Sequence, residues 1–324
     1  MSVANPPWAV AIFAARETPA VLADTVRAAV AACAGRRATI DVLINGNPAL
    51  AEQFAAHSST LAQALASDAC TLRIWSIAAP DKAHTWNEYV YRIWEDRDGG
   101  STAFFIDGYA RVKPDALAAI DRRLAATPDA MGASGVPSCG RSAARLRALM
   151  LREGGIHGNL YAVTAEGMRA IRADGFRLPL GLYRTDPMLG AALAYRLDPA
   201  KYEWQPNRIV VEGDATWDVD GISELTYKNV TGYFKRRLRQ AQGDLENRAL
   251  REHMTVKRLP PNQLPQTAQE MVFGWLHAQP AQARSLFLKR PTTWYAARKL
   301  RAARDWSATR VAPKLLLTQG GLAA

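Results

Sequence analysis

No run of this sequence stays apolar for the roughly 18 residues that a membrane-crossing helix requires. The first seven residues also lack the basic region and apolar core of a secretory signal. Cysteine is scarce: Cys33, Cys70 and Cys139 stand far apart and in no C-x-x-C spacing, which argues against a disulfide framework and a zinc site. These absences favour a cytoplasmic protein with reduced, buried thiols.

The motifs of several enzyme classes are also missing. The chain has no G-x-G-x-x-G and no G-x-x-x-x-G-K-[ST], so neither a dinucleotide-dependent enzyme nor a P-loop NTPase is supported. It has no H-E-x-x-H, and Gly132–Val136 departs from the G-x-S-x-G pattern of hydrolases because its last residue is valine. Metalloprotease and hydrolase functions are therefore not expected.

What is present is an excess of positive charge near one end of the chain. The 324 residues are 48% hydrophobic and 22% charged, which is ordinary for a globular protein. Their formal net charge is +11. Residues 251–324 hold 12 Lys and Arg against 3 Asp and Glu, whereas residues 1–250 hold 29 against 27. Because the charge belongs to the tail, it does not indicate a nucleic-acid partner, and none is expected.

Strand and helix patterns alternate along the first 245 residues. Apolar runs predict strands within 8–17, at 39–45, near 72–77, and at 103–106, 130–136, 158–163 and 208–212. Helices are predicted after Thr18 and Pro114 and over about 84–96, 164–173, 188–195 and 227–242. This alternation favours a mostly parallel α/β sheet flanked by helices. We expect this domain over 1–250, a proline-rich linker at 259–265, and a basic, mainly helical C-terminal extension over 251–324.

The most informative residue is the aspartate that ends the strand Ala103–Asp107. Pro114 and Asp115 then start a helix, as expected for proline and an acid at a helix N-terminus. Open α/β sheets bind ligands at the carboxyl ends of their strands, so Asp107 is a candidate metal or ligand carboxylate. Its alternative role is to cap a turn or the next helix.

Taken in order, these elements and short motifs resemble family 2 glycosyltransferases of the GT-A type, which use nucleotide-sugar donors. The resemblance covers about residues 8–245 and rests on the order of weak motifs. It implies a nucleotide pocket formed by the end of the first strand and the turn after the second, at Ala14, Arg16, Glu17, Asn45 and Asn47. The family often holds the base with an aspartate after the second strand, so the asparagines here leave the base open.

The resemblance also implies a metal site. Asp107-Gly108-Tyr109 stands where the family has Asp-x-Asp, through which a divalent cation bridges carboxylate and diphosphate. The implied cofactor is Mg²⁺ or Mn²⁺ at Asp107, since magnesium often uses one or two carboxylates plus substrate phosphates. Tyr109 replaces the second acid, and Arg111 or Lys113 is an alternative source of positive charge.

Two further segments follow from the resemblance. Residues 81–87 are similar to a family stretch ending in asparagine that contacts the nucleotide or sugar, which implies such contacts for Lys82 and Asn87. Their alternative is a plain helix N-terminus. The run Lys235–Gln240 is either a solvated helix face or a diphosphate contact.

The acceptor side is implied around Thr185-Asp186-Pro187. There Asp186 matches the family's general base, which takes the proton of the acceptor hydroxyl. Local sequence alone predicts Asp186 as a helix N-cap with Pro187 at the first helical position. Gly154–Asn159 then lies nearby, with Asn159 orienting a hydroxyl and His157 more often structural.

The sequence therefore predicts an inverting, metal-assisted glycosyltransferase acting in glycan or glycolipid assembly. Its basic tail either lies on an anionic membrane at the inner face, near a lipid-linked acceptor, or packs as a helical cap. A nucleotidylyltransferase is disfavoured because no glycine-rich loop follows the first strand. The alternative from another class is a non-catalytic scaffold with this fold, supported by Tyr109 and Asn45 in place of acids.

Overall fold

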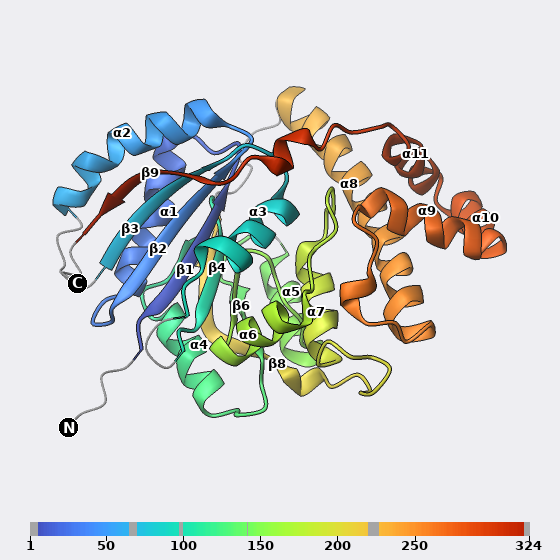
Figure 1. Ribbon diagram of the computed structural model, residues 1–324, viewed down its shortest axis with the longest axis horizontal. Helices are drawn as coiled ribbons and strands as arrows, with labels where there is room; N and C mark the ends of the chain where they lie inside the picture. The colour runs from blue at the N-terminus through green and yellow to red at the C-terminus, as the bar shows by residue number, and fades with distance from the viewer. Residues whose placement is uncertain (1–5, 65–69, 97–99, 141, 220–226, 321–324) are drawn as a thin grey trace.

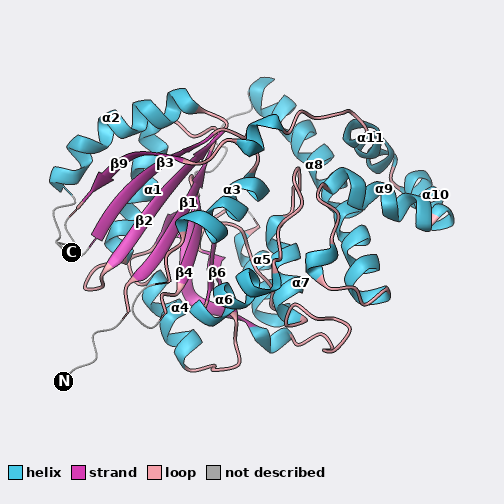
Figure 2. Ribbon diagram, viewed as in Figure 1, coloured by secondary structure: helices cyan, strands magenta, loops and turns pink. Residues whose placement is uncertain are grey.

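The computed structural model describes residues 6–64, 70–96, 100–140, 142–219 and 227–320, with the side chains of 59–64 and 227–236 left out. In this part of the chain one twisted sheet runs through the molecule with helices on both faces (Figure 1, Figure 2). Its strands are β1 (Trp8–Ala14), β2 (Ala38–Asn45), β3 (Cys70–Ile77), β4 (Ala103–Asp107), β5 (Arg111–Val112), β6 (Gly132–Pro137), β7 (Leu160–Val163), β8 (Ile209–Asp218) and β9 (Lys314–Gln319).

The strand order is β5-β8-β6-β7-β4-β1-β2-β3-β9. Strands β1 to β4 are mutually parallel, and β6 is parallel to β8, whereas β7 runs antiparallel between β4 and β6. The edge strands β5 and β9 are also antiparallel to their neighbours. The predicted α/β sheet of mostly parallel strands flanked by helices is therefore confirmed.

Helices cover both faces of the sheet. They are α1 (Pro19–Ala32), α2 (Pro48–Ala64), α3 (Lys82–Glu88), α4 (Ala116–Ala125), α5 (Ala143–Glu153), α6 (Ala165–Asp174), α7 (Thr185–Ala194), α8 (Tyr227–Arg251), α9 (Ala268–Ala278), α10 (Pro280–Lys289) and α11 (Pro291–Leu300). Side chains of α1, α2 and α4 pack on one face, and those of α3 and α6–α11 form the core of the other.

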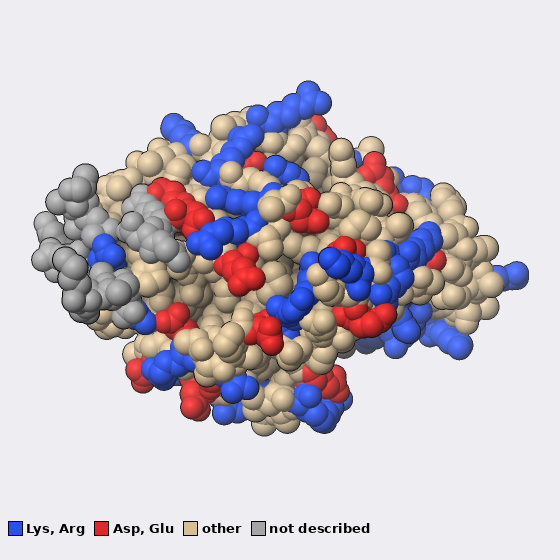
Figure 3. All heavy atoms as spheres, turned by 60° about the horizontal axis from the view of Figure 1, so that its bottom comes forward, with Lys and Arg blue, Asp and Glu red and all other residues tan. Residues whose placement is uncertain are grey.

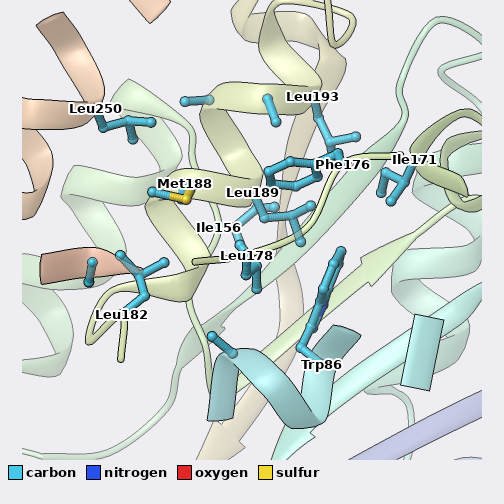
Figure 4. Packing of buried hydrophobic residues seen from close by; sticks show 14 of the residues in the cluster. Trp86, Ile156, Ile171, Phe176, Leu178, Leu182, Met188, Leu189, Leu193 and Leu250 are labelled. Atoms are coloured by element: carbon cyan, nitrogen blue, oxygen red, sulfur yellow. The ribbon is translucent and has the colours of Figure 1, made fainter. Parts of the chain in front are cut away.

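The strands β1 and β4 are buried on both faces, which explains their continuous apolar sequences. In β4, Phe105 packs toward α3 and Phe104 toward the α1 side. Phe105 is fully buried, and such burial contributes about 1.5–3 kcal/mol. On the α3 side, Trp86 points toward Phe176 and Leu178, with Leu189 of α7 behind them (Figure 4). This core fixes α3 and α7 against the sheet.

The C-terminal region is mainly helical and basic, as predicted, but a strand, β9, follows its helices. After α8 and the π-helical segment Glu252–Val256, helices α9–α11 gather beside α8 at one end of the molecule (Figure 1). The chain then crosses back over the sheet, and β9 pairs with β3. The sequence did not predict this strand, and the domain boundary at residue 250 stays a prediction.

Several expected details differ from the structure. The helix expected over 84–96 is α3 followed by the π-helical segment Tyr89–Ile93. The strand expected at 208–212 extends to residue 218. Cys33 is buried and Cys70 is partly buried, but Cys139 is exposed, so the prediction of buried thiols is wrong there.

The order of the strands places the site. The chain leaves β1 to one side for β2 and β3, then crosses to the other side for β4. In open α/β sheets a crevice forms at the carboxyl ends of the strands where the direction of winding reverses. Here that position lies beyond the ends of β1 and β4, at Ala14 and Asp107.

Candidate active site

A cavity of about 790 Å³ lies at this carboxyl edge. Its walls come from the ends of β1, β2 and β4, the start of α3, the segments before β7 and α7, and one residue of α8. The cavity brings together nine of the ten predicted site residues, which are Ala14, Arg16, Glu17, Asn45, Asn47, Lys82, Asp107, Tyr109 and Asp186. Asn87 is not among its lining residues.

Asp107 is the last residue of β4 and has two polar partners. Its Oδ1 forms an ion pair with Nζ of Lys82, at the start of α3. Its Oδ2 lies 3.1 Å from the hydroxyl of Tyr109. Burial alone would lower the pKa of Lys82, but Asp107, with Asp186 and Glu17, outweighs it and raises that pKa. Lys82 is therefore charged at neutral pH.

Tyr109 stays a neutral hydroxyl in this setting. Burial is the main cause that raises its pKa, and the Asp107 carboxylate adds to it. The same hydroxyl lies 3.3 Å from Oδ1 of Asn159, so it bridges β4 to the segment before β7. The residue that replaces the second acid of the Asp-x-Asp pattern thus acts as a hydrogen-bond donor.

Three charged groups surround Gly158. A Cβ atom at this position would lie 3.5 Å from Nζ of Lys82 and 3.6 Å from Oδ1 of Asp186. It would lie 3.7 Å from Oδ2 of Asp107. The end of β4, the start of α3 and the first turn of α7 therefore bring a cation and two carboxylates to one point. The missing side chain of Gly158 leaves this point open to a ligand.

Asp186 reaches the cavity from the first turn of α7. The helix begins at Thr185 with Arg184 as its N-cap, so the sequence-based prediction of Asp186 as N-cap is wrong. An acid in the first turn of a helix still interacts favourably with the helix dipole. The position leaves the carboxylate directed at the cavity rather than used for capping.

The loop before α7 is held by buried acids. The two carboxylate oxygens of Glu246, in α8, accept hydrogen bonds from the backbone N–H groups of Tyr183 (2.9 Å) and Arg184 (3.1 Å). Oδ2 of Asp81 accepts one from Gly181 (2.8 Å), and its Oδ1 caps α3 at His84 (2.7 Å). Burial raises the pKa of both Glu246 and Asp81, and these hydrogen bonds oppose that rise.

Asn87 belongs to the same support, not to the cavity. Its side-chain amide donates to the carbonyl of Leu178 and accepts from the Leu178 N–H, both at 2.9 Å. The contact of Asn87 with nucleotide or sugar that the resemblance implies stays a prediction, and in this structure its amide is bonded to the Leu178 backbone. The roles of Glu246 and Asp81 in holding the loop were not predicted from the sequence. Only Asp81 has a local signal, its position before a helix, and nothing near Glu246 marks its partners.

The two asparagines that the resemblance places in the nucleotide pocket hold the backbone at the end of β1. The side chain of Asn45 donates to the carbonyl of Ala14, and that of Asn47 to the carbonyl of Ala15, each at 3.0 Å. Gly46 between them has a φ of 62°, and a Cβ there would lie 2.3 Å from Cβ of Pro80. Only glycine fits this turn, which therefore defines the edge of the cavity.

Glu17 closes the same edge. Its carboxylate accepts hydrogen bonds from the backbone N–H groups of Ala15 (2.6 Å) and Arg16 (2.9 Å). The side chain of Arg16 is exposed beside it. The predicted nucleotide residues are thus gathered into one wall.

The remaining candidates divide between cavity and surface. His157 lines the cavity with its ring 4.9 Å from that of Trp217, and burial lowers its pKa, so it is neutral at pH 7. Lys113 pairs with Asp218, and neither Lys113 nor Arg111 lines the cavity. Within the basic run, the side chains of 235 and 236 lie outside the described residues, while Arg239 lines the cavity.

No protein-family model matches this chain, and no curated protein matches it in sequence. Among solved structures it is similar to the mannosyltransferase PcManGT from Pyrobaculum calidifontis, solved with GDP-Man and Mn²⁺. The TM-score is 0.53 at 17% identity, over 91% of this chain and 85% of that one.

It is also similar to glucosyl-3-phosphoglycerate synthase from Mycobacterium tuberculosis, with a TM-score of 0.46 at 13% identity, over 71% of this chain and 76% of that one. The likeness to PcManGT establishes the fold. This chain has the GT-A fold of nucleotide-sugar transferases, as the resemblance implied, and membership of family 2 stays a prediction.

Proposed function

We propose that this chain is a glycosyltransferase that moves a sugar from a nucleotide-diphospho-sugar to a hydroxyl group of a glycan or glycolipid, with inversion. The observation that carries the proposal is the meeting of Lys82, Asp107 and Asp186 around Gly158. The fold supports it, because this point lies where open α/β sheets bind ligands. PcManGT, of the same fold, was solved with a nucleotide sugar.

Asp186 is the proposed general base. It takes the proton from the acceptor hydroxyl while that oxygen attacks the anomeric carbon and the bond to the diphosphate breaks. The electron pair of that bond leaves with the nucleoside diphosphate, near Lys82 and Asp107. Positive charge from Lys82 stabilises the leaving group, and the fixed loop before α7 aligns Asp186 with the reacting atoms.

The proposed cofactor is Mg²⁺ or Mn²⁺. Among the described residues, no three His, Cys, Asp or Glu side chains gather as a protein-only metal site would require. A cation that arrives with the donor needs less from the protein, since one carboxylate and the substrate phosphates suffice. Asp107 fits that role as the protein ligand. Bound there, the cation would neutralise charge on the diphosphate.

A calorimetric titration tests the proposal. UDP, GDP and dTDP are added to the purified protein, each with and without Mn²⁺. We expect metal-dependent binding of one nucleotide, weakened about tenfold or more, or about 1.4 kcal/mol, by Asp107→Asn. Asp115→Asn, an exposed acid outside the cavity, is the control. Failure of all three nucleotides to bind would move the function to the non-catalytic scaffold.

Peripheral membrane contact is the second part of the proposal. Within the described residues, no helix is long and apolar enough to cross a membrane. Residues 271–304 contain seven Lys and Arg and no Asp or Glu. Lys and Arg project from the end of the molecule where α9–α11 lie (Figure 3). Residues 271–304 have no acidic side chain of their own to balance this charge. Arg290 forms an ion pair with Asp244, which belongs to α8.

The same helices expose large apolar side chains. Leu288 is 77% exposed and Trp294 51%, and both border a groove of about 560 Å³ between α9, α10 and α11. Exposed Leu and Trp among basic residues are typical of surfaces that lie on anionic membranes. This surface supports action at the inner membrane face on a lipid-linked acceptor.

Vesicle co-sedimentation checks this contact. We expect the full chain to bind vesicles of phosphatidylcholine with phosphatidylglycerol, and to bind less in high salt because screening weakens the attraction. Leu288→Glu combined with Trp294→Glu should reduce binding about tenfold or more, since each removes exposed apolar area that membrane binding would bury. Leu149→Glu with Leu151→Glu, exposed on α5, is the matched control. Equal binding by all three proteins would contradict the proposal.

A further inference from the structure

Two arginines line the side of the cavity that carries Asp186. Arg184 immediately precedes α7, and Arg239 comes from α8. The ends of β1, β2 and β4 form another part of the wall and hold the residues assigned to the donor. Under the proposed function, an acceptor must approach from the Arg184 side for its hydroxyl to reach Asp186.

Arg184 is seated by close contact with α8. A Cβ at Gly243 would lie 2.6 Å from Cδ and 2.9 Å from Cγ of Arg184, so only glycine leaves room for this side chain. Glycine in a helix interior costs about 1 kcal/mol relative to alanine. The buried carboxylate of Glu246 also accepts the backbone N–H of Arg184. Gly243 therefore lowers the stability of α8 slightly and leaves room for the Arg184 side chain, while Glu246 holds the Arg184 backbone.

Arg239 lies on the same face of α8. It precedes Gly243 by four residues and Glu246 by seven, and these spacings place side chains along one side of a helix. Its guanidinium carbon lies 5.8 Å from the ring centroid of Tyr183, a cation–π distance. One face of α8 thus carries Arg239, Gly243, which contacts the Arg184 side chain, and Glu246, which holds the loop before α7.

These arginines differ from Lys82 in their pairing. Among the described residues, the ion pairs include Lys82 with Asp107 but neither Arg184 nor Arg239. Arg184 is close enough to Glu246 to oppose the rise of the Glu246 pKa that burial causes. The oxygens of Glu246, however, are already bonded to backbone N–H groups and to Gln242. Two guanidinium groups therefore face a cavity that holds one carboxylate on their side, Asp186.

We propose that Arg184 and Arg239 bind an anionic group, a phosphate or a carboxylate, carried by the acceptor. The planar guanidinium binds such groups through paired hydrogen bonds. This inference rests on the proposed function and narrows its substrate class to acceptors with a negative charge near the attacking hydroxyl. The diphosphate of the donor is the other source of the same chemistry.

Two titrations separate these sources. Inorganic phosphate and succinate are titrated by calorimetry into protein saturated with the nucleotide that binds, or into free protein if none binds. Nucleotide affinity is measured separately. We expect Arg184→Gln and Arg239→Gln each to weaken the binding of phosphate or succinate at least tenfold, and nucleotide binding less than twofold. Arg122→Gln and Arg123→Gln, exposed on α4, are matched controls.

Gly243→Ala is a second variant that keeps both charges. It displaces the Arg184 side chain, so we expect it to weaken anion binding with the nucleotide affinity unchanged. A tenfold loss of nucleotide affinity in the arginine variants would overturn the inference and assign them to the donor diphosphate. So would anion binding that is absent or equal in all variants. If the wild-type chain binds no nucleotide, the proposed function is refuted instead. The anion titration into the free protein then still tests whether Arg184 and Arg239 bind an anion.

Discussion

Gly158 has no side chain, and three charged groups lie around the place that a side chain would take. The contacts that a Cβ would make with Lys82, Asp107 and Asp186, at 3.5–3.7 Å, are ordinary van der Waals distances. A methyl group therefore fits the folded protein without strain. It would, however, occupy the place where we propose that the three charged groups meet the substrates.

Gly158→Ala should accordingly separate folding from activity. We expect an unchanged thermal unfolding midpoint and a transfer rate roughly 100-fold lower, since small misplacements of reacting groups have effects of that size. Rates are measured with the donor identified by calorimetry. Gly274→Ala, in α9 with open space around it, is the control and should retain full activity. A Gly158→Ala enzyme of normal rate would show that the meeting point is not where the substrates lie.

Single residues also show which positions in the cavity could be predicted from the sequence. Asp107 and Asn45 end β-strands, and the end of a strand fixes where a side chain emerges, so both were found in the cavity. Asn87 sits on a helix, where the face that meets a partner depends on tertiary packing. Its partner, Leu178, lies 91 residues away, and no local pattern reveals that contact.

At the scale of elements, the loop from Leu178 to Arg184 connects the two halves of the site. Asp81 and Asn87 hold it from the α3 side, and Glu246 from the α8 side. Gln242 adds a hydrogen bond of 3.1 Å to the carbonyl of Gly181. A loop with so many buried partners arrives at α7 in one conformation, which fixes Asp186 and Arg184.

Glu246→Gln tests this coupling. The amide nitrogen of glutamine would face a backbone N–H, so one hydrogen bond becomes a clash between donors, at a cost of about 1–3 kcal/mol. We expect a transfer rate at least tenfold lower, unchanged nucleotide affinity, and faster trypsin cleavage after Arg184.

The comparison needs a control and a second background. Glu252→Gln, a partly buried acid that accepts from Gln279 and not from the loop, should change neither rate nor cleavage. In an Asp186→Asn background, Glu246→Gln should have little further effect on the rate, because both changes act through one group. Additive losses would mean that Glu246 does not act through Asp186.

At the scale of the whole molecule, the two edges of the central sheet are formed by different kinds of strand. On one side the two-residue strand β5 ends it, and on the other β9 covers β3. The alternation of strands and helices predicted β1 to β4 and β6 to β8, because local apolar runs define them. It did not predict β9, which has no fully buried residue and whose partner is distant in sequence.

Disrupting β9 should therefore affect solubility more than the site. Leu317→Pro removes an N–H from the strand, and proline is poorly tolerated inside a sheet. We expect a lower unfolding midpoint and more aggregation, with nucleotide binding retained, since an uncovered strand edge recruits other chains. Light scattering and thermal unfolding measure this. Thr318→Ala, exposed on the same strand, should behave as wild type, and equal solubility of both variants would contradict a protective role for β9.

The pairing of β9 with β3 also has a consequence for synthesis on the ribosome. Residues 78–313 lie between the two strands. At about 5–20 residues per second, roughly 10 to 50 seconds of translation pass before β3 meets its partner. During that interval β3 is an uncovered edge of the nascent sheet. Folding of this chain is expected to depend on what occupies that edge in the meantime, so chaperone supply and translation speed should influence its yield more than the strength of its core.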